Sequence, residues 1–160
     1  MEFLDIELNE KLVRNILIGI LVFIVVFLAL QMSSLLVFKS YKMGANTTVQ
    51  AEEINTHIDI LEHVGGKLEL AGWAYKEGEE IKTFNSSYVI KNKETGKMYR
   101  MRTQMEENIN IPEEDPNRMK AGLHARCLLA GLPKGEYDIL VLYKNDGNDI
   151  LASTQISVNL

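Results

Sequence analysis

The stretch LPKGEYDILVLYK, residues 132–144, decides the fold that we expect. Its second half is rich in aliphatic, β-branched and aromatic residues, which is typical of a strand. The turn at Gly135 comes just before Tyr137, and Leu132 comes before the turn. A tyrosine at the start of a late strand indicates the tyrosine corner of a Greek-key β-sandwich, in which the hydroxyl bonds to backbone a few residues upstream. We therefore predict that Leu132, Gly135 and Tyr137 form a structural tyrosine corner.

Similar runs occur on both sides of this stretch, and turn residues separate them. Glycine marks the turns at residues 65–66, 93–97 and 145–148. The expected strands are residues 58–61, 67–75, 84–92, 98–105, 122–129, 136–144 and 149–160. This pattern predicts an all-β domain over residues 51–160, a β-sandwich of about seven strands.

Residues 16–38, ILIGILVFIVVFLALQMSSLLVF, carry no charged side chain. As a helix they would be roughly 34 Å long, enough to cross a hydrocarbon core of about 30 Å. The uninterrupted apolar part, residues 16–30, would also suit the h-region of a signal peptide. A retained anchor is favoured because the apolar pattern resumes at Leu35 and no small-x-small cleavage site comes cleanly after it. We therefore predict a transmembrane helix at residues 16–38.

The flanks of this segment set the expected topology. Residues 1–15 form a short tail, which is easily retained in the cytoplasm while a signal-anchor exports the part of the chain that comes after it. Residues 39–50, KSYKMGANTTVQ, show no periodicity and are interpreted as a linker. We expect a single-pass protein of the cell membrane whose C-terminal domain, residues 51–160, is extracytoplasmic.

Three polar residues, Gln31, Ser33 and Ser34, lie inside the expected span or near its outer edge. Polar side chains at that depth often hydrogen-bond to a neighbouring helix. The alternative is that they bond to their own backbone or reach headgroup water. The first interpretation predicts that these residues contact an integral membrane partner.

The composition excludes several functions. The formal net charge is −5 and no basic stripe is present, which argues against nucleic acid as a ligand. The single cysteine, Cys127, excludes an intramolecular disulfide and a cysteine-based metal site. Its neighbours Ala125 and Leu128 indicate a small buried hydrophobe rather than a reactive thiol. An extracytoplasmic domain without disulfides fits a bacterial envelope.

The residue types that usually carry catalysis are scattered. The histidines His57, His63 and His124 show neither H-x-x-x-H nor H-x-H spacing, and no serine lies in a G-x-S-x-G elbow. His124 is expected on the solvent face of its strand, near Arg126. We therefore predict no catalytic residue, no metal site and no cofactor.

The aromatic side chains are the remaining candidates for ligand contact. Trp73 is expected in the core, like the buried tryptophan of many sandwiches. Tyr75 and Tyr99 are better candidates for exposure, and they would be the residues that stack on sugar rings in a carbohydrate-binding module.

Four runs of the domain share a pattern: LAGWA at 70–74, SYVIKNKETGKMY at 87–99, GLHA at 122–125 and LPKGEY at 132–137. They resemble a family of immunoglobulin-like domains from surface and polysaccharide-assembly proteins of Gram-positive bacteria. Domains of that family are appended to glycosyltransferases or stand alone behind one membrane helix. The resemblance extends over residues 68–158. It implies an immunoglobulin-like sandwich and an envelope setting, and it implies no reaction.

Three functions remain open at this point. The leading hypothesis is a non-enzymatic accessory or scaffolding subunit of a membrane complex that assembles envelope polysaccharide or surface proteins. The alternative is a carbohydrate-binding module for a wall or capsule glycan, which an exposed row of two or three aromatic residues on one sheet face would favour. A hydrolase would need a cleft with two carboxylates about 5 to 9 Å apart, and the sequence selects no such pair.

Overall fold

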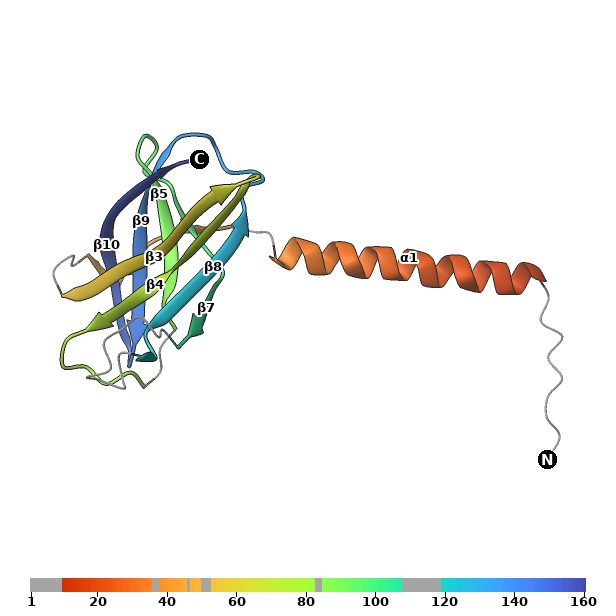
Figure 1. Ribbon diagram of the computed structural model, residues 1–160. Coiled ribbons are helices and arrows are strands. Elements are labelled where there is room, and N and C mark those ends of the chain that lie inside the picture. The colour runs from red at the N-terminus through yellow and green to blue at the C-terminus, as the bar shows by residue number, and fades with distance from the viewer. Residues whose placement is uncertain (1–9, 36–37, 46, 50–52, 83–84, 108–118) are drawn as a thin grey trace, which may run out of the picture. The chain divides into compact units, whose positions relative to one another are not determined.

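The computed structural model describes residues 10–35, 38–45, 47–49, 53–82, 85–107 and 119–160. Within these ranges the chain forms an N-terminal helix and a β-domain (Figure 1). The helix and the domain are separate compact units.

The helix α1, Glu10–Leu35, begins and ends earlier than the predicted span of residues 16–38. Part of the predicted tail, residues 1–15, is therefore helical. Its residues from Glu10 onward are mostly good helix formers, and an acidic side chain in the first turn suits the helix dipole. The segment Glu10–Gln31 is long and apolar enough to cross a membrane, as a single-pass anchor or a signal sequence would.

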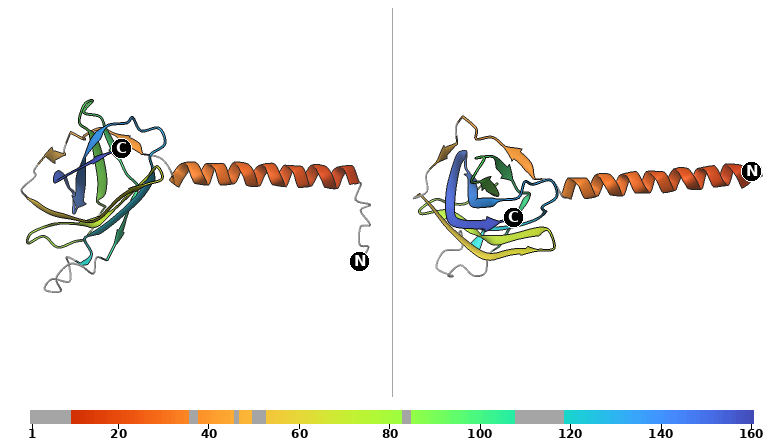
Figure 2. Two further views of the ribbon diagram at one scale, coloured as in Figure 1. Left: turned by 45° about the horizontal axis from the view of Figure 1, so that its top comes forward. Right: turned by 90° about the horizontal axis from the view of Figure 1, so that it is seen from above.

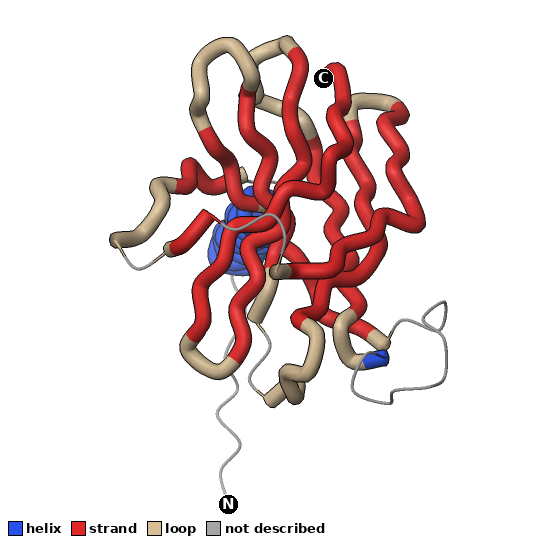
Figure 3. Tube along the Cα trace, turned by 90° about the vertical axis from the view of Figure 1, so that its left-hand side faces the viewer, coloured by secondary structure: helices blue, strands red, loops and turns tan. Residues whose placement is uncertain are grey.

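The β-domain contains two sheets, which Figure 3 shows in red. The six-stranded sheet has the order β1-β6-β5-β9-β10-β2, and the four-stranded sheet has the order β3-β4-β8-β7. Neighbouring strands are antiparallel, except that β10 and β2 are parallel. The strands are β1 Lys39–Tyr41, β2 Thr48–Val49, β3 Ile54–Val64, β4 Lys67–Lys76, β5 Ser87–Asn92, β6 Met98–Arg100, β7 Thr103–Glu106, β8 Gly122–Leu128, β9 Glu136–Asn145 and β10 Asn148–Asn159.

Both sheets contribute alternate residues to one hydrophobic core. The core residues of the longer inner strands are Leu68, Leu70, Ala74, Tyr88, Ile90, Leu123, Ala125, Cys127, Tyr137, Ile139, Val141 and Tyr143. Burial raises the pKa of the Cys127 thiol. The prediction that this cysteine is a small buried hydrophobe is therefore confirmed.

The predicted strands are present with shifted ends, and one of them is divided. The run 98–105 forms β6 in the six-stranded sheet and β7 in the four-stranded sheet. Between them Met101 is buried, and the hydroxyl oxygen of Thr103 accepts a hydrogen bond from the backbone N–H of Tyr88 at 3.0 Å. These contacts hold the chain where it crosses from one sheet to the other. Instead of about seven strands, the described part of the domain therefore has the ten strands β1 to β10.

The prediction that residues 39–50 form a linker is wrong. Strand β1 pairs with β6 at one edge of the six-stranded sheet, and β2 pairs with β10 at the opposite edge. Tyr41 of β1 also packs against a second apolar cluster, in which Val89, Leu142 and Leu151 are buried. We call β1, β2 and the described residues between them the strap; it is orange in Figure 2. Strands this short leave no periodic pattern, which is why the sequence does not indicate them.

The hydrogen bond expected of the tyrosine corner is present. The hydroxyl of Tyr137 donates to the carbonyl oxygen of Pro133 at 2.7 Å. Leu132 packs against the core, and Gly135 has a φ of 149°, which favours glycine. The backbone of Gly135 also exchanges two hydrogen bonds with Leu160, each 2.9 Å long. The turn before β9 is thus tied both to its own strand and to the end of the chain.

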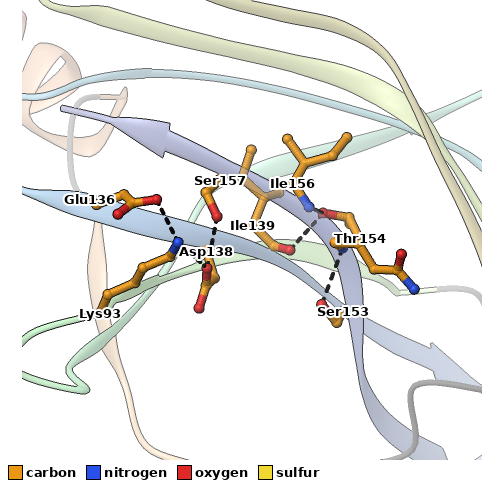
Figure 4. Close-up of polar contacts among 9 residues, drawn as sticks. Lys93, Glu136, Asp138, Ile139, Ser153, Thr154, Ile156 and Ser157 are labelled. Carbon is orange, nitrogen blue, oxygen red and sulfur yellow. Dashed lines mark hydrogen bonds and ion pairs between the residues drawn. The ribbon is translucent and has the colours of Figure 1, made fainter.

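A bulge bends β10. Its register with β9 shifts between Ser153 and Ile156, and Gln155 adopts a positive φ of 60°. The hydroxyl of Thr154 donates to the carbonyl oxygen of Ile139 at 2.7 Å, and it accepts from the backbone N–H of Ile156 at 3.3 Å (Figure 4). These bonds compensate for the ladder bonds that the bulge interrupts.

Candidate functional site

The outer face of the four-stranded sheet carries a row of rings. In β4 the even-numbered residues from 68 to 74 are buried, so the odd-numbered residues point away from the core. Trp73 and Tyr75 therefore lie on the outer face, and His57 of β3 lies directly opposite Trp73. The ring centroids of His57 and Trp73 are 5.5 Å apart, those of Trp73 and Tyr75 are 5.3 Å apart, and both pairs are stacked. We call these three residues the aromatic row.

Two of the predictions about aromatic residues are wrong. Trp73 is half-buried on the outer face and does not belong to the core. Tyr99 lies in the other sheet and packs against the core, where its ring centroid is 6.4 Å from that of Tyr137. Tyr75 is half-buried on the outer face. The structure therefore does not bring together the predicted glycan contacts, Tyr75 and Tyr99, and Trp73 is the neighbour of Tyr75 instead.

Gly72 explains why Trp73 points outward. A Cβ atom on Gly72 would lie 2.0 Å from the carbonyl oxygen of His57, so the inward position next to Trp73 accepts no side chain. The register between β3 and β4 shifts there, between Ile58 and Ile60, which leaves Asp59 as a bulge. The close approach of the two backbones places His57 across from Trp73.

Three charged or ionisable side chains lie beside the aromatic row: Glu69 of β4, and His124 and Arg126 of β8. We call these three residues the charge cluster. Arg126 donates two hydrogen bonds to the Glu69 carboxylate, at 2.7 and 2.8 Å. The His124 Nε2 atom is 2.9 Å from Glu69 Oε1, and its Nδ1 atom is 3.8 Å from Glu106 of β7. The contacts with His124 and then with Arg126 hold the pKa of the Glu69 carboxyl below its ordinary value. The prediction that His124 lies on the solvent face of its strand, near Arg126, is confirmed. The sequence did not indicate their shared partner Glu69.

Replacing Glu69 by glutamine is expected to change how stability depends on pH. A carboxyl group whose pKa is lower in the folded state than in the unfolded chain stabilises the folded state at pH values above its unfolded-state pKa. This contribution is lost as the pH falls through the folded-state pKa. The midpoint of thermal unfolding should therefore be lower for Glu69→Gln than for the wild type at pH 7. The difference should shrink as the pH falls below about 4.5.

Thermal unfolding followed by circular dichroism between pH 3 and pH 8 measures this effect. Glu94→Gln is the control, because Glu94 is an exposed carboxylate in the turn between β5 and β6, in the other sheet from Glu69. Parallel curves for Glu69→Gln and the wild type over the whole pH range would contradict the prediction.

The aromatic row has apolar and polar neighbours. Ile60 of β3 is 40% exposed. It lies opposite Ala71, which is between Trp73 and Glu69 on the outer face of β4. His57 has a side chain that is 59% exposed. The face thus combines stacked rings and an exposed aliphatic side chain with the charge cluster at its side. This is the composition of a binding surface with an aromatic centre and a polar rim.

The other predicted site residues lie elsewhere. Gln31 is exposed on α1, and the side chains of Ser33 and Ser34 lie outside the described part of the chain. Among the described residues, no three His, Cys, Asp or Glu side chains come together as a metal site would require. Period-two alternation in KLELAGWAYK would have placed Glu69, Trp73 and Tyr75 on one face, but it could not say which face was outside.

Comparisons of this chain with protein-family models, with curated proteins and with solved structures found no match. What the outer face can do chemically therefore rests on its own geometry. Stacked rings, an exposed aliphatic side chain and a bidentate arginine–carboxylate pair are groups that recognise another surface.

Proposed function

We propose that this chain is a membrane-anchored, non-enzymatic accessory or scaffolding subunit of a cell-envelope complex. In this proposal α1 anchors the chain beside an integral membrane partner, and the extracytoplasmic domain docks a protein through the aromatic row. The observation that carries the proposal is the half-exposed stack of His57, Trp73 and Tyr75 on the outer face of a sheet. Tryptophan and tyrosine dominate the binding energy of many protein interfaces, where polar rims exclude water around them.

The proposal includes an immunoglobulin-like fold, which the strand order supports. The four-stranded order β3-β4-β8-β7 matches A-B-E-D of an immunoglobulin domain. The order β6-β5-β9-β10 matches C′-C-F-G, and the strap adds β1 and β2 at the two edges. Tyr137, with its bond to Pro133, then occupies the start of strand F, where immunoglobulin domains place their tyrosine corner.

Glycan recognition is the second candidate, because two large aromatic side chains share one sheet face. A sugar ring stacks on the flat face of an aromatic ring. In the aromatic row, however, the rings stack on one another, with interplanar angles of 26° and 27°. Stacking partners already cover part of the ring faces that a sugar needs. This geometry favours a protein partner over a glycan.

Co-purification tests the proposal directly. The tagged full-length chain is isolated from its native membranes in mild detergent, and the proteins that elute with it are identified by mass spectrometry. We expect a stoichiometric integral membrane protein with the wild type. Trp73→Ala should lower its yield roughly tenfold or more, since loss of a central tryptophan removes a hot spot. Lys91→Ala, an exposed residue of β5 on the other sheet, should leave the yield unchanged.

Two further outcomes separate the parts of the proposal. Loss of the partner when Gln31, Ser33 and Ser34 are all replaced by leucine would assign part of the contact to the helix. Equal yields for Trp73→Ala and the wild type would show that the aromatic row is not the docking surface. A chain that elutes alone from native membranes, and that binds a purified wall glycan only when Trp73 is present, would favour the second candidate instead.

A further inference from the structure

The two sheets differ in how their edges are closed. The six-stranded sheet ends in β1 and β2, which are three and two residues long. The four-stranded sheet ends in β3, an edge strand of 11 residues with the sequence INTHIDILEHV. Natural proteins protect exposed edges with short strands, lysine, proline or bulges. Strand β3 is long and has neither lysine nor proline, so its protection rests on the bulge at Asp59 and on the charge of Glu62.

The bulge protects only the first half of β3. Beyond it, residues 60–64 form a regular ladder with β4 on one side. Among the described residues, no strand pairs with them on the other side. All five side chains are exposed, with exposed fractions of 40% for Ile60, 37% for Leu61 and 71% for Val64. An exposed apolar strand with free backbone groups is a template for pairing with another strand.

We propose that the edge of β3 beyond the bulge pairs antiparallel with the same edge of a second copy of this chain, so that residues 60–62 of one copy lie opposite residues 60–62 of the other. Such a contact is isologous, because a twofold axis normal to the sheet brings one edge onto itself. Two copies that share one membrane through α1 also meet at a high effective concentration. The proposal is independent of the protein-docking function proposed for the aromatic row.

The charge of Glu62 excludes one position of the twofold axis, and the apolar side chain of Leu61 favours another. An axis at Glu62 would place two carboxylates directly opposite each other, which is destabilising. An axis at Leu61 instead places the two leucines opposite each other and sets Glu62 against Ile60 of the second copy. We therefore place the axis at Leu61. The four-stranded sheets of the two copies then form one continuous sheet, and both aromatic rows lie on the same face of it.

Cysteine cross-linking of the full-length chain in membranes tests this arrangement. In an antiparallel pair the Cα atoms of directly opposite residues are about 4.5 to 5.5 Å apart, which suits a disulfide. Residues one step from the axis are diagonal to their own copies, at about 7 to 8 Å, which is too far. Single cysteines at residues 60 to 64 should therefore give a sharp maximum of disulfide-linked dimer for Leu61→Cys. The wild type is a clean background, because its Cys127 is buried.

Two controls keep the result interpretable. Val49→Cys, at an exposed position on the edge strand β2, should give only the background level of dimer. Cysteines introduced together at Ile60 and Glu62 lie opposite each other across the axis and should also cross-link; adding Leu61→Lys should abolish that dimer, while the thermal unfolding midpoint shows that the domain remains folded. Cross-linking at residues 60 to 64 that does not exceed the Val49→Cys level would overturn the proposal.

Discussion

Replacing Gly72 by alanine is expected to lower the free energy of unfolding by about 3 kcal/mol, the upper part of the range for overpacked cores. The added Cβ atom would lie 2.0 Å from the carbonyl oxygen of His57 and 3.0 Å from the Cα atom of Ile58. Both obstacles are backbone atoms, so no side-chain rotation relieves the clash. Strand β3 must move away from β4, and the stacking of His57 on Trp73 must weaken with it.

Denaturant unfolding measures this loss, and Trp73 supplies the fluorescence signal because it is the single tryptophan of the chain. Ala71→Gly is the matched control: it removes a methyl group at the adjacent outward position and should cost about 0.5–1 kcal/mol. A Gly72→Ala domain as stable as the wild type would contradict the close approach of the two strands. The same variant should also bind any partner of the aromatic row more weakly, since it displaces one of the three rings.

The strands were predictable because their signals are local and repeated. Runs such as KLELAGWAYK and EYDILVLYK have the composition and alternation of strands, and glycine-containing turns separate them. The tyrosine hydrogen bond was predictable for the same reason, since Leu132, Gly135 and Tyr137 lie within one short stretch. Local patterns of this kind need no knowledge of which strands become neighbours.

The candidate site depends on contacts between distant residues, and these left no local signal. The sequence predicts Trp73 in the core, but the even-numbered residues of β4 face the core and leave Trp73 on the outer face. The sequence predicts Tyr99 as exposed, but its pairing with Ile90 of β5 places it on the core side of the sheet. The partner of His124 and Arg126 was missed because Glu69 is 55 and 57 residues away from them. Cross-strand register decides each of these cases, and it is a property of the whole sheet.

The strap is where the sequence prediction and the structure differ most, and its removal is expected to have the second large effect. Replacing residues 39–49 in the full chain by a glycine–serine sequence of equal length should lower the free energy of unfolding by about 3 kcal/mol. A loss of this size is expected because Val89, Leu142 and Leu151 are buried in the cluster that Tyr41 joins, and complete burial of one such side chain contributes about 1.5–3 kcal/mol. The thermal midpoint of the domain should fall by about 10 °C.

Single substitutions in the strap separate packing from edge protection. Tyr41→Ala removes a ring from the apolar cluster but leaves the backbone pairing of β1 with β6, so it should reproduce only part of the loss. Lys42→Ala, an exposed neighbour, should leave the midpoint unchanged. A glycine–serine replacement with the wild-type midpoint would show that residues 39–49 act only as a linker. If the midpoint falls as expected, the segment after α1 belongs to the folded domain, because it closes both edges of the six-stranded sheet and covers part of its outer apolar cluster.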